Sequence, residues 1–225
     1  GTASAKPTPT PTPTPTPKPG SDDDKPRPRE PAGANKAWPF ASKLHPLVES
    51  IPASEEGSIE SVAKYIASRE KDPHLLVKAL HDYVADRIAY DAAGLEDKTY
   101  YRKQDAKTVF ANKYGVCAGY ARLLAALGQI AGTKIPYVGG YSRDMNGDVF
   151  GQGHAWNAAE IDGSWYLIDA TWDAGYVNGR TFTKKYTADY LLTPPEVFGI
   201  NHFPDKEKWQ LRKTPISRGD FMRLP

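Results

Sequence analysis

The sequence predicts an α+β domain in which helices come first and an antiparallel sheet follows. Apolar residues recur at helical spacing from residue 58 to residue 130. From residue 135 to residue 172, apolar and polar residues alternate instead. Asn-Gly and Asp-Gly pairs punctuate this second part, and both are typical of hairpin turns. A run of helices followed by a run of strands is characteristic of the α+β class.

Residues 1–35 are predicted to be a linker, and residues 36–225 a single domain. Ten of the twenty prolines lie before residue 35, and most of them alternate with threonine. Proline fixes φ and removes an amide donor, so this segment favours an extended polyproline II conformation. Pro/Thr-rich segments of this kind occur as stalks of secreted or cell-surface proteins. We therefore expect this chain to be secreted or to lie at the cell surface. The threonines would either carry O-linked sugars or remain unmodified.

Composition narrows the classes of partner. The formal net charge is +2 and no basic run is visible, so we expect no nucleic-acid partner. No apolar stretch is long enough to span a bilayer. The single cysteine cannot form an internal disulfide. We expect a monomer that acts on a protein or peptide substrate.

The domain is predicted to begin with a surface arm and two helices. The arm, residues 38–52, is irregular but carries aromatic and apolar side chains that would pack on the domain. The first helix covers residues 58–68. The second starts at Asp72-Pro73, where a capping carboxylate precedes a proline at the first helical position. Because the link between the two helices is short, we expect them to be antiparallel.

A short helix over residues 105–113 and a long apolar helix follow. The long helix begins just after Gly115, runs through Ile130 and ends at Gly132. Its apolar side chains recur at helical spacing and form a stripe that we expect to be buried. The stripe consists of Val116, Tyr120, Leu123, Leu124, Leu127 and Ile130.

Three strands are predicted after the long helix, over residues 135–141, 155–161 and 164–172. The first two are joined across an Asn-Gly turn at residues 145–148. The last two form a hairpin around Asp162-Gly163. We therefore expect the long helix to pack on an antiparallel sheet.

The C-terminal part is less regular. Residues 186–192 are predicted to add a strand or a short helix, which Pro194-Pro195 would end. Residues 202–211 carry several aromatic side chains. We expect this segment to wrap over the domain and to be anchored by those aromatics.

Cys117 is the first candidate catalytic residue, because it lies in the predicted first turn of the long helix. Unpaired amides there form the positive end of the helix dipole, which stabilises a thiolate. The same amides could hold an oxyanion that develops on an attacked carbonyl. The alternative is that Cys117 is a small buried apolar residue, as many free cysteines are.

His154 and Asp169 are the other two candidates, and the predicted hairpin brings them together. A two-residue turn at Asp162-Gly163 fixes the register. In that register, Trp156 lies opposite Asp169. His154, two residues earlier, lies opposite Thr171. His154 and Asp169 are then diagonal neighbours with backbones roughly 7–8 Å apart, and Trp156 shields them from water on the same face.

These residue types are the components of a cysteine nucleophile with an oriented base. Asp169 would fix the tautomer of His154, which would deprotonate Cys117 and later protonate the leaving group. The alternative is a buried His-Asp pair that only ties the hairpin together.

Three motifs resemble the transglutaminase-like superfamily. They are Gly-Val-Cys-Ala-Gly-Tyr-Ala at residues 115–121, Gly-His-Ala-Trp-Asn at residues 153–157 and Trp-Tyr-Leu-Ile-Asp-Ala-Thr-Trp at residues 165–172. His202-Phe203-Pro204 and Trp209 resemble the kyphoscoliosis-peptidase branch. The resemblance covers about residues 59–211. It implies a papain-like core and a Cys-His-Asp triad, which falls here on Cys117, His154 and Asp169.

The resemblance implies acyl transfer through a thioester. The acceptor is water in peptidases and an amine in transglutaminases, and we expect hydrolysis of peptide or amide bonds. A protein-glutamine transglutaminase and a non-catalytic scaffold domain remain alternatives. Tyr90, Tyr101 and Gln104 are candidates for the oxyanion-binding side chain, besides the amide of Cys117.

No metal or other cofactor is expected. Residues 144–148 imitate the start of a calcium-binding loop, but Val149 and Ala155 occupy positions where such a loop needs glycine and glutamate. His45, His74, His81 and His202 lack the spacing of metal ligands and have no cysteine companions.

Overall fold

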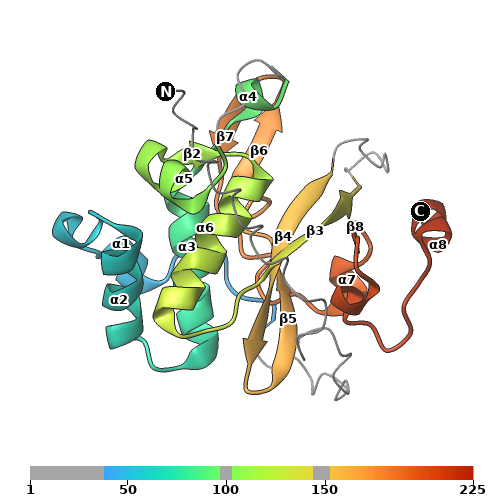
Figure 1. Cartoon of the computed structure of the whole chain (residues 1–225), viewed down its shortest axis with the longest axis horizontal. Helices are drawn as coiled ribbons and strands as arrows, with labels where there is room; N and C mark the ends of the chain where they lie inside the picture. The colour runs from blue at the N-terminus through green and yellow to red at the C-terminus, as the bar shows by residue number, and fades with distance from the viewer. Residues whose placement is uncertain (1–37, 97–102, 144–152, 225) are drawn as a thin grey trace, which may run out of the picture.

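The computed structural model describes residues 38–96, 103–143 and 153–224. The predicted linker over residues 1–35 and the predicted turn at residues 145–148 lie outside these ranges. The long helices lie to one side of a four-stranded sheet, and the last short helices lie to the other (Figure 1). The predicted α+β class is therefore confirmed.

The helical part begins with α1 (Pro46–Glu49), the 3-10 turn η2 (Ala53–Glu55), α2 (Ile59–Arg69) and α3 (Pro73–Arg87). Ser58 caps α2 through a capping box. The Asp72 carboxylate accepts hydrogen bonds from the first two free amides of α3 at 2.8 and 2.9 Å. Both predicted helices are thus present, and α3 begins at the capping residue that the sequence indicates.

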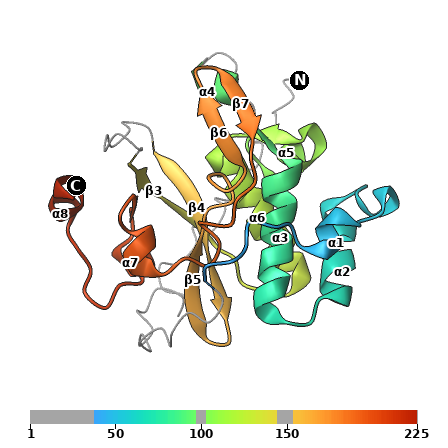
Figure 2. The same cartoon turned by 180° about the vertical axis from the view of Figure 1, so that it is seen from behind.

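The segment before these helices lies against the domain as the predicted arm. Figure 2 shows it, in blue, crossing the back of the molecule towards α3. The indole of Trp38 donates to the carbonyl oxygen of Asp189 at 3.2 Å. Further along, the amide of His45 donates to the buried carboxylate of Asp82 at 2.7 Å. Hydrogen bonds to distant parts of the chain therefore hold the arm at Trp38 and at His45.

The long helix, α6 (Cys117–Ala131), follows the short helices α4 (Ala92–Glu96) and α5 (Ala106–Asn112) and packs against α2, α3 and α5 and against the sheet. Four members of its predicted stripe are no more than 1% exposed, namely Tyr120, Leu123, Leu124 and Leu127. Ile130 is 38% exposed, so that part of the prediction was wrong. Gly132, with φ +79°, ends the helix.

A two-residue parallel ladder that the sequence does not predict precedes α6. It pairs β1 (Ala89–Tyr90) with β2 (Tyr114–Gly115). Strands this short carry no measurable alternation, so no sequence pattern could reveal them. The ladder brings Tyr90 beside the start of α6.

The main sheet has the order β5-β4-β3-β8, and all its neighbours are antiparallel. Its strands are β3 (Tyr137–Ser142), β4 (His154–Ile161), β5 (Ser164–Ile168) and β8 (His202–Pro204). Asp162 and Gly163 both have positive φ, as the predicted two-residue turn requires. Ile161 pairs with Ser164, which confirms the predicted register of this hairpin.

The predicted strand over residues 164–172 is too long, because β5 ends at Ile168. From Asp169 the chain turns: the Asp169 amide donates to the Tyr190 carbonyl, and its carboxylate accepts the Thr171 amide at 2.8 Å. Trp156 therefore does not lie opposite Asp169. His154 pairs with Gly140 of β3 instead of with Thr171.

The C-terminal third adds a separate hairpin of β6 (Gly175–Asn178) and β7 (Thr181–Lys184), which lies beside α4 (Figure 1). The strand or helix predicted over residues 186–192 is absent. Thr193, directly after this segment, forms an isolated bridge with Leu167. Short elements follow, namely α7 (Pro195–Phe198), β8, the 3-10 turn η4 (Glu207–Gln210) and α8 (Arg218–Arg223). Of the segment 202–211 that was predicted to wrap over the domain, residues 202–204 instead form an edge strand of the sheet, β8.

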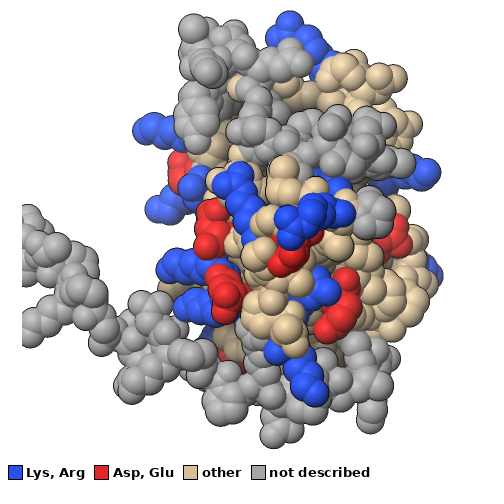
Figure 3. All heavy atoms as spheres, turned by 90° about the vertical axis from the view of Figure 1, so that its right-hand side faces the viewer, with Lys and Arg blue, Asp and Glu red and all other residues tan. Residues whose placement is uncertain are grey.

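Charges of both signs are interspersed on the face that carries the C-terminal helices (Figure 3). That face shows no continuous area of one charge among the described residues. None of the described helices combines the length and the apolar character needed to cross a bilayer.

Candidate active site

Cys117 is the first residue of α6. Val116 precedes it and offers no capping side chain. The Val116 carbonyl accepts from the amides of Gly119 and Tyr120 at 2.8 and 3.2 Å. Among the described residues, the amides of Cys117 and Ala118 have no backbone acceptor, as expected for a helix start. Unpaired donors are thus present beside the thiol.

Two glycines of the cysteine motif are required by close packing against Gln104. The Gln104 Oε1 atom accepts from the Val116 amide at 2.9 Å and thereby holds the loop that enters α6. A Cβ atom on Gly115 or Gly119 would lie 2.8 or 2.5 Å from this oxygen. Cys117 is 8% exposed and packs against Ala155 next to His154.

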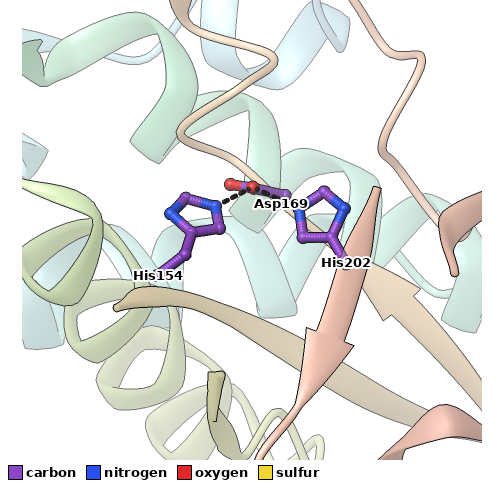
Figure 4. Close-up of side chains that lie close together, drawn as sticks. All are labelled: His154, Asp169 and His202. Carbon is purple, nitrogen blue, oxygen red and sulfur yellow. Dashed lines mark hydrogen bonds and ion pairs between the residues drawn. The ribbon is translucent and has the colours of Figure 1, made fainter. Parts of the chain in front are cut away.

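His154 lies at the start of β4, and its imidazole points to Asp169 (Figure 4). The Nε2 atom is 2.6 Å from the Asp169 Oδ2 atom. Cys117 lies close enough to the imidazole to contribute to the raised pKa of His154. The predicted contact between His154 and Asp169 is therefore present, and Cys117 lies within reach of the same ring.

The electrostatics of this site favour a charged imidazole. Burial by itself would lower the pKa of His154, but Asp169 and Cys117 outweigh it and raise the pKa to about 10. Burial would raise the pKa of Asp169, but the two histidines bonded to it hold its pKa far below the usual range. His154 is consequently an imidazolium at neutral pH, paired with a buried carboxylate.

Aromatic side chains enclose the imidazole. The ring centroids of Trp156 and Trp172 lie 5.9 and 5.5 Å from that of His154. Trp156 is 1% exposed, and its position on this face agrees with the alternation in the sequence. Aromatic walls exclude water, and this strengthens the interaction between His154 and Asp169.

A buried charge network holds the turn that carries Asp169. The Asp173 carboxylate, at the end of this turn, accepts from the Tyr190 amide at 3.1 Å. It also lies 3.1 Å from the Nε2 atom of His81, whose Nδ1 atom is 2.9 Å from Asp82. Burial would lower the pKa of His81, but Asp173 and Asp82 raise it to about 9. A buried imidazolium on α3 therefore anchors the turn.

Of the three candidates for the oxyanion-binding side chain, Tyr90 lies close enough to Cys117 and Asp169 for their charges to affect it. Burial, together with the nearby Cys117 and Asp169, raises the pKa of Tyr90, so its hydroxyl remains a donor. Gln104 uses its side-chain oxygen to hold Val116. Tyr101 lies outside the described residues.

A third side chain joins the pair of His154 and Asp169, and the sequence analysis did not assign it a role there. The Nε2 atom of His202, on β8, is 3.0 Å from Asp169 Oδ2 (Figure 4). Ligand atoms of the three residues lie within 4.8 Å of one another, a spacing that one metal ion could bridge. In the structure these atoms are joined directly by hydrogen bonds. In the sequence, His202 stands out only by its place in the His-Phe-Pro motif. Its contact with Asp169 could not be predicted, because the sequence does not show that β8 lies beside β3.

Comparison with known proteins places part of this chain in a family. Residues 60–170 match the model of the transglutaminase-like superfamily. Kyphoscoliosis peptidase from Homo sapiens is 36% identical over 153 residues, which cover 64% of this chain and 23% of that protein. Hillarin from Drosophila melanogaster is 30% identical over 131 residues, which cover 50% of this chain and 16% of that protein. The chain thus spans less than a quarter of the length of these relatives.

A solved structure described as a TGase is 21% identical, with a TM-score of 0.43, and the match covers 59% of this chain and 34% of that one. Cys117, His154 and Asp169 lie within residues 60–170, the segment that matches the family model. The first two sequence motifs lie within this segment as well, and the third begins in it. Residues 60–170 of this chain therefore belong to the transglutaminase-like superfamily, and kyphoscoliosis peptidase is among their curated relatives.

Proposed function

We propose that this domain is a cysteine-dependent acyl-transfer enzyme in which Cys117 is the nucleophile, His154 the acid and base, and Asp169 the group that orients the imidazole. The observation that carries the proposal is that one imidazole interacts with both other side chains. His154 Nε2 is bonded to Asp169, which leaves Nδ1 for the thiol. Membership of a superfamily that includes cysteine peptidases and transglutaminases supports this assignment.

The reaction follows from these positions. In the resting site the proton of Cys117 resides on His154 Nδ1, and Asp169 stabilises the imidazolium. The thiolate attacks the carbonyl carbon of an amide, and the carbonyl oxygen becomes an oxyanion. His154 then returns the proton to the leaving amine, the C–N bond breaks, and a thioester remains on Cys117. An acceptor attacks the thioester, with His154 now acting as base.

Donors at the helix start would stabilise the oxyanion. The amide of Cys117 is one, because it has no backbone acceptor among the described residues. The hydroxyl of Tyr90 is a second, since this side chain lies close enough to Cys117 for the two to affect each other's charge. Removal of one such donor in other enzymes slows the reaction by roughly 100-fold to 1,000-fold.

Hydrolysis of peptide or amide bonds is the reaction we favour. Kyphoscoliosis peptidase, the relative with 36% identity, is named a peptidase, which favours water as the acceptor. An amine acceptor would make the same thioester a transamidation intermediate. The location at the cell surface rests on the Pro/Thr-rich segment alone and is part of the proposal.

The test is the rate of Cys117 alkylation by iodoacetamide as a function of pH. Cys117 is the only cysteine, so no other thiol contributes to the signal. The intact chain is compared with His154→Ala, and His74→Ala is the control for loss of a histidine away from the site. A free thiol is only about 0.3% ionised at pH 6.

We expect the intact chain and His74→Ala to react at pH 6 roughly tenfold or more faster than His154→Ala, because the imidazolium holds a thiolate. If all three chains follow one curve typical of a free thiol, Cys117 is not activated. The proposal is then wrong, and the domain is a scaffold with an idle thiol.

A further inference from the structure

His202 shares the carboxylate oxygen that holds His154. The Asp169 Oδ2 atom lies 2.6 Å from the Nε2 atom of His154 and 3.0 Å from the Nε2 atom of His202 (Figure 4). The two imidazoles approach from different strands, His154 from β4 and His202 from β8. Asp169 therefore has two histidine partners, of which the proposed reaction uses only one.

The other oxygen of Asp169 is occupied as well. The Oδ1 atom accepts from the backbone amides of Thr171 and Trp172 at 2.8 and 3.2 Å. Each carboxylate oxygen thus has two donors, and Asp169 is 0% exposed. A buried carboxylate needs such a complete set, because no water is available to replace a missing donor. Without His202, Oδ2 would keep only His154 as a partner, while the two backbone amides would still hold Oδ1.

Packing fixes the position of His202. Its side chain is 0% exposed and its ring lies 3.9 Å, centroid to centroid, from that of Phe198 in a stacked arrangement. The Trp172 ring is 4.5 Å away on a tilted plane. The Nδ1 atom lies 2.7 Å from the Oδ1 atom of Asn201, whose amide nitrogen donates to the Tyr190 hydroxyl. His202 is therefore held at both nitrogens and by ring contacts.

His202 remains neutral while His154 is charged. Burial and the nearby His154 lower the pKa of His202 to about 4, although Asp169 opposes this change. A neutral ring that donates through Nε2 needs a donor at Nδ1. In the structure the Asn201 amide presents its oxygen to His202 and donates through its nitrogen to the Tyr190 hydroxyl. It supplies the required donor only when the amide is turned over, with its oxygen then accepting from Tyr190. The charge of Asp169 is then left to His154 alone.

We propose that His202 is a positioning residue: it donates Nε2–H to Asp169 Oδ2 and so fixes the carboxylate in the orientation that holds the His154 imidazolium against Cys117. This inference rests on the proposed function, since it gives His202 a role in the thiolate–imidazolium pair. His202 itself touches neither Cys117 nor the substrate in this mechanism.

The test uses a matched pair of substitutions in the full chain. His202→Gln places an amide nitrogen near the position of Nε2, within reach of Asp169. His202→Asn places its amide near the position of Nδ1, short of Asp169. Both side chains are neutral and polar, so their difference isolates the hydrogen bond to Asp169. His45→Phe is the control for loss of a buried histidine elsewhere, because His45 pairs with Glu70.

The readout is the pH profile of Cys117 alkylation, with near-ultraviolet circular dichroism to establish that each variant is folded. We expect His202→Asn to react roughly tenfold more slowly than the intact chain at pH 6, since a hydrogen bond to a charged group is lost. His202→Gln should stay within about threefold of the intact chain, and His45→Phe should leave the profile unchanged. In an Asp169→Asn background, His202→Asn should add less than about twofold, because both substitutions remove the same interaction.

Three outcomes would overturn the inference while leaving the proposed function intact. The first is a normal profile in His202→Asn. The second is a folded His202→Gln variant that reacts as slowly as is expected of His202→Asn. This outcome is decisive even if His202→Asn does not fold, because glutamine keeps a donor near Asp169. The third is a full additional effect in the Asp169→Asn background. By contrast, a profile in the intact chain that does not depend on His154 would overturn the proposed function, and this inference with it.

Discussion

Replacing His81 by glutamine tests the buried charge network beneath the site. His81 is 0% exposed and lies between two buried carboxylates, 2.9 Å from Asp82 and 3.1 Å from Asp173. Glutamine is neutral at every pH, so the substitution removes the only proton-dependent contribution of this position. The folded-state pKa of His81, about 9, is above the ordinary value of 6.5.

The sign of the effect follows from the direction of this change. A group whose pKa is raised in the folded state contributes stability that is fully present below its unfolded pKa and is lost as the pH rises through its folded pKa. For His81 the stabilisation is present below about pH 6.5 and disappears as the pH rises through 9. A rise from 6.5 to about 9 corresponds to about 3 kcal/mol of unfolding free energy.

The assay is urea denaturation of the intact chain and of His81→Gln at pH 6, 7.5 and 9. We expect the variant to be less stable by about 3 kcal/mol at pH 6, and the difference to shrink to less than about 1 kcal/mol at pH 9. His74→Gln, on the same helix, is the control for replacing a histidine whose ring contacts Tyr166. A difference between the intact chain and His81→Gln that stays constant from pH 6 to pH 9 would show that no buried imidazolium exists at this position.

The remaining predictions concern stability and the C-terminal segment. A Cβ atom on Gly140 would collide with the carbonyl oxygen of Phe203 on β8, so Gly140→Ala should lower the unfolding free energy by about 2 to 3 kcal/mol in urea denaturation. Gly57→Ala, where a Cβ meets nothing within 4 Å, should change it by less than about 0.5 kcal/mol, and equal effects would contradict the reasoning. The buried guanidinium of Arg143 bonds to carbonyl groups in and after α8 and lies 5.1 Å from the Phe221 ring. Arg143→Met should therefore release α8, and limited proteolysis should cleave the variant near residue 218 faster than it cleaves the intact chain. An unchanged rate of cleavage would show that other contacts hold α8.

Much of the fold could be predicted from the sequence, because its signals are local. Asp72 before Pro73 begins α3, and Gly132 ends α6, since capping and positive φ depend on the residues at the helix ends themselves. The Asp162-Gly163 turn sets the register of β4 and β5 for the same reason. These features depend on neighbours in the chain, and the chain shows its neighbours directly.

What could not be predicted depends on contacts between distant segments. The strand predicted to continue to residue 172 ends at Ile168 because the Asp169 amide bonds to Tyr190, twenty-one residues later in the sequence. The contact of His154 with Asp169 is nevertheless present. Its predicted route, diagonal neighbours within one ladder, was wrong, because the turn at Asp169 brings the carboxylate to the imidazole.

His202 illustrates the same limit at the site. It is separated from Asp169 by thirty-three residues, and only the pairing of β8 with β3 brings the two together. No spacing rule connects a histidine on an edge strand with an aspartate in a turn. Its burial and its shared oxygen became visible only once the sheet order was known.

The central claim is that Cys117 accepts an acyl group with the help of His154. The most direct measurement is mass analysis of the chain after brief exposure to an activated ester, p-nitrophenyl acetate, and an acid quench. We expect a single acetyl group on Cys117, absent from Cys117→Ala and formed at least tenfold more slowly in His154→Ala. If Cys117 remains unacylated, or is acylated at the same rate with and without His154, then Cys117 is not a nucleophile that His154 activates.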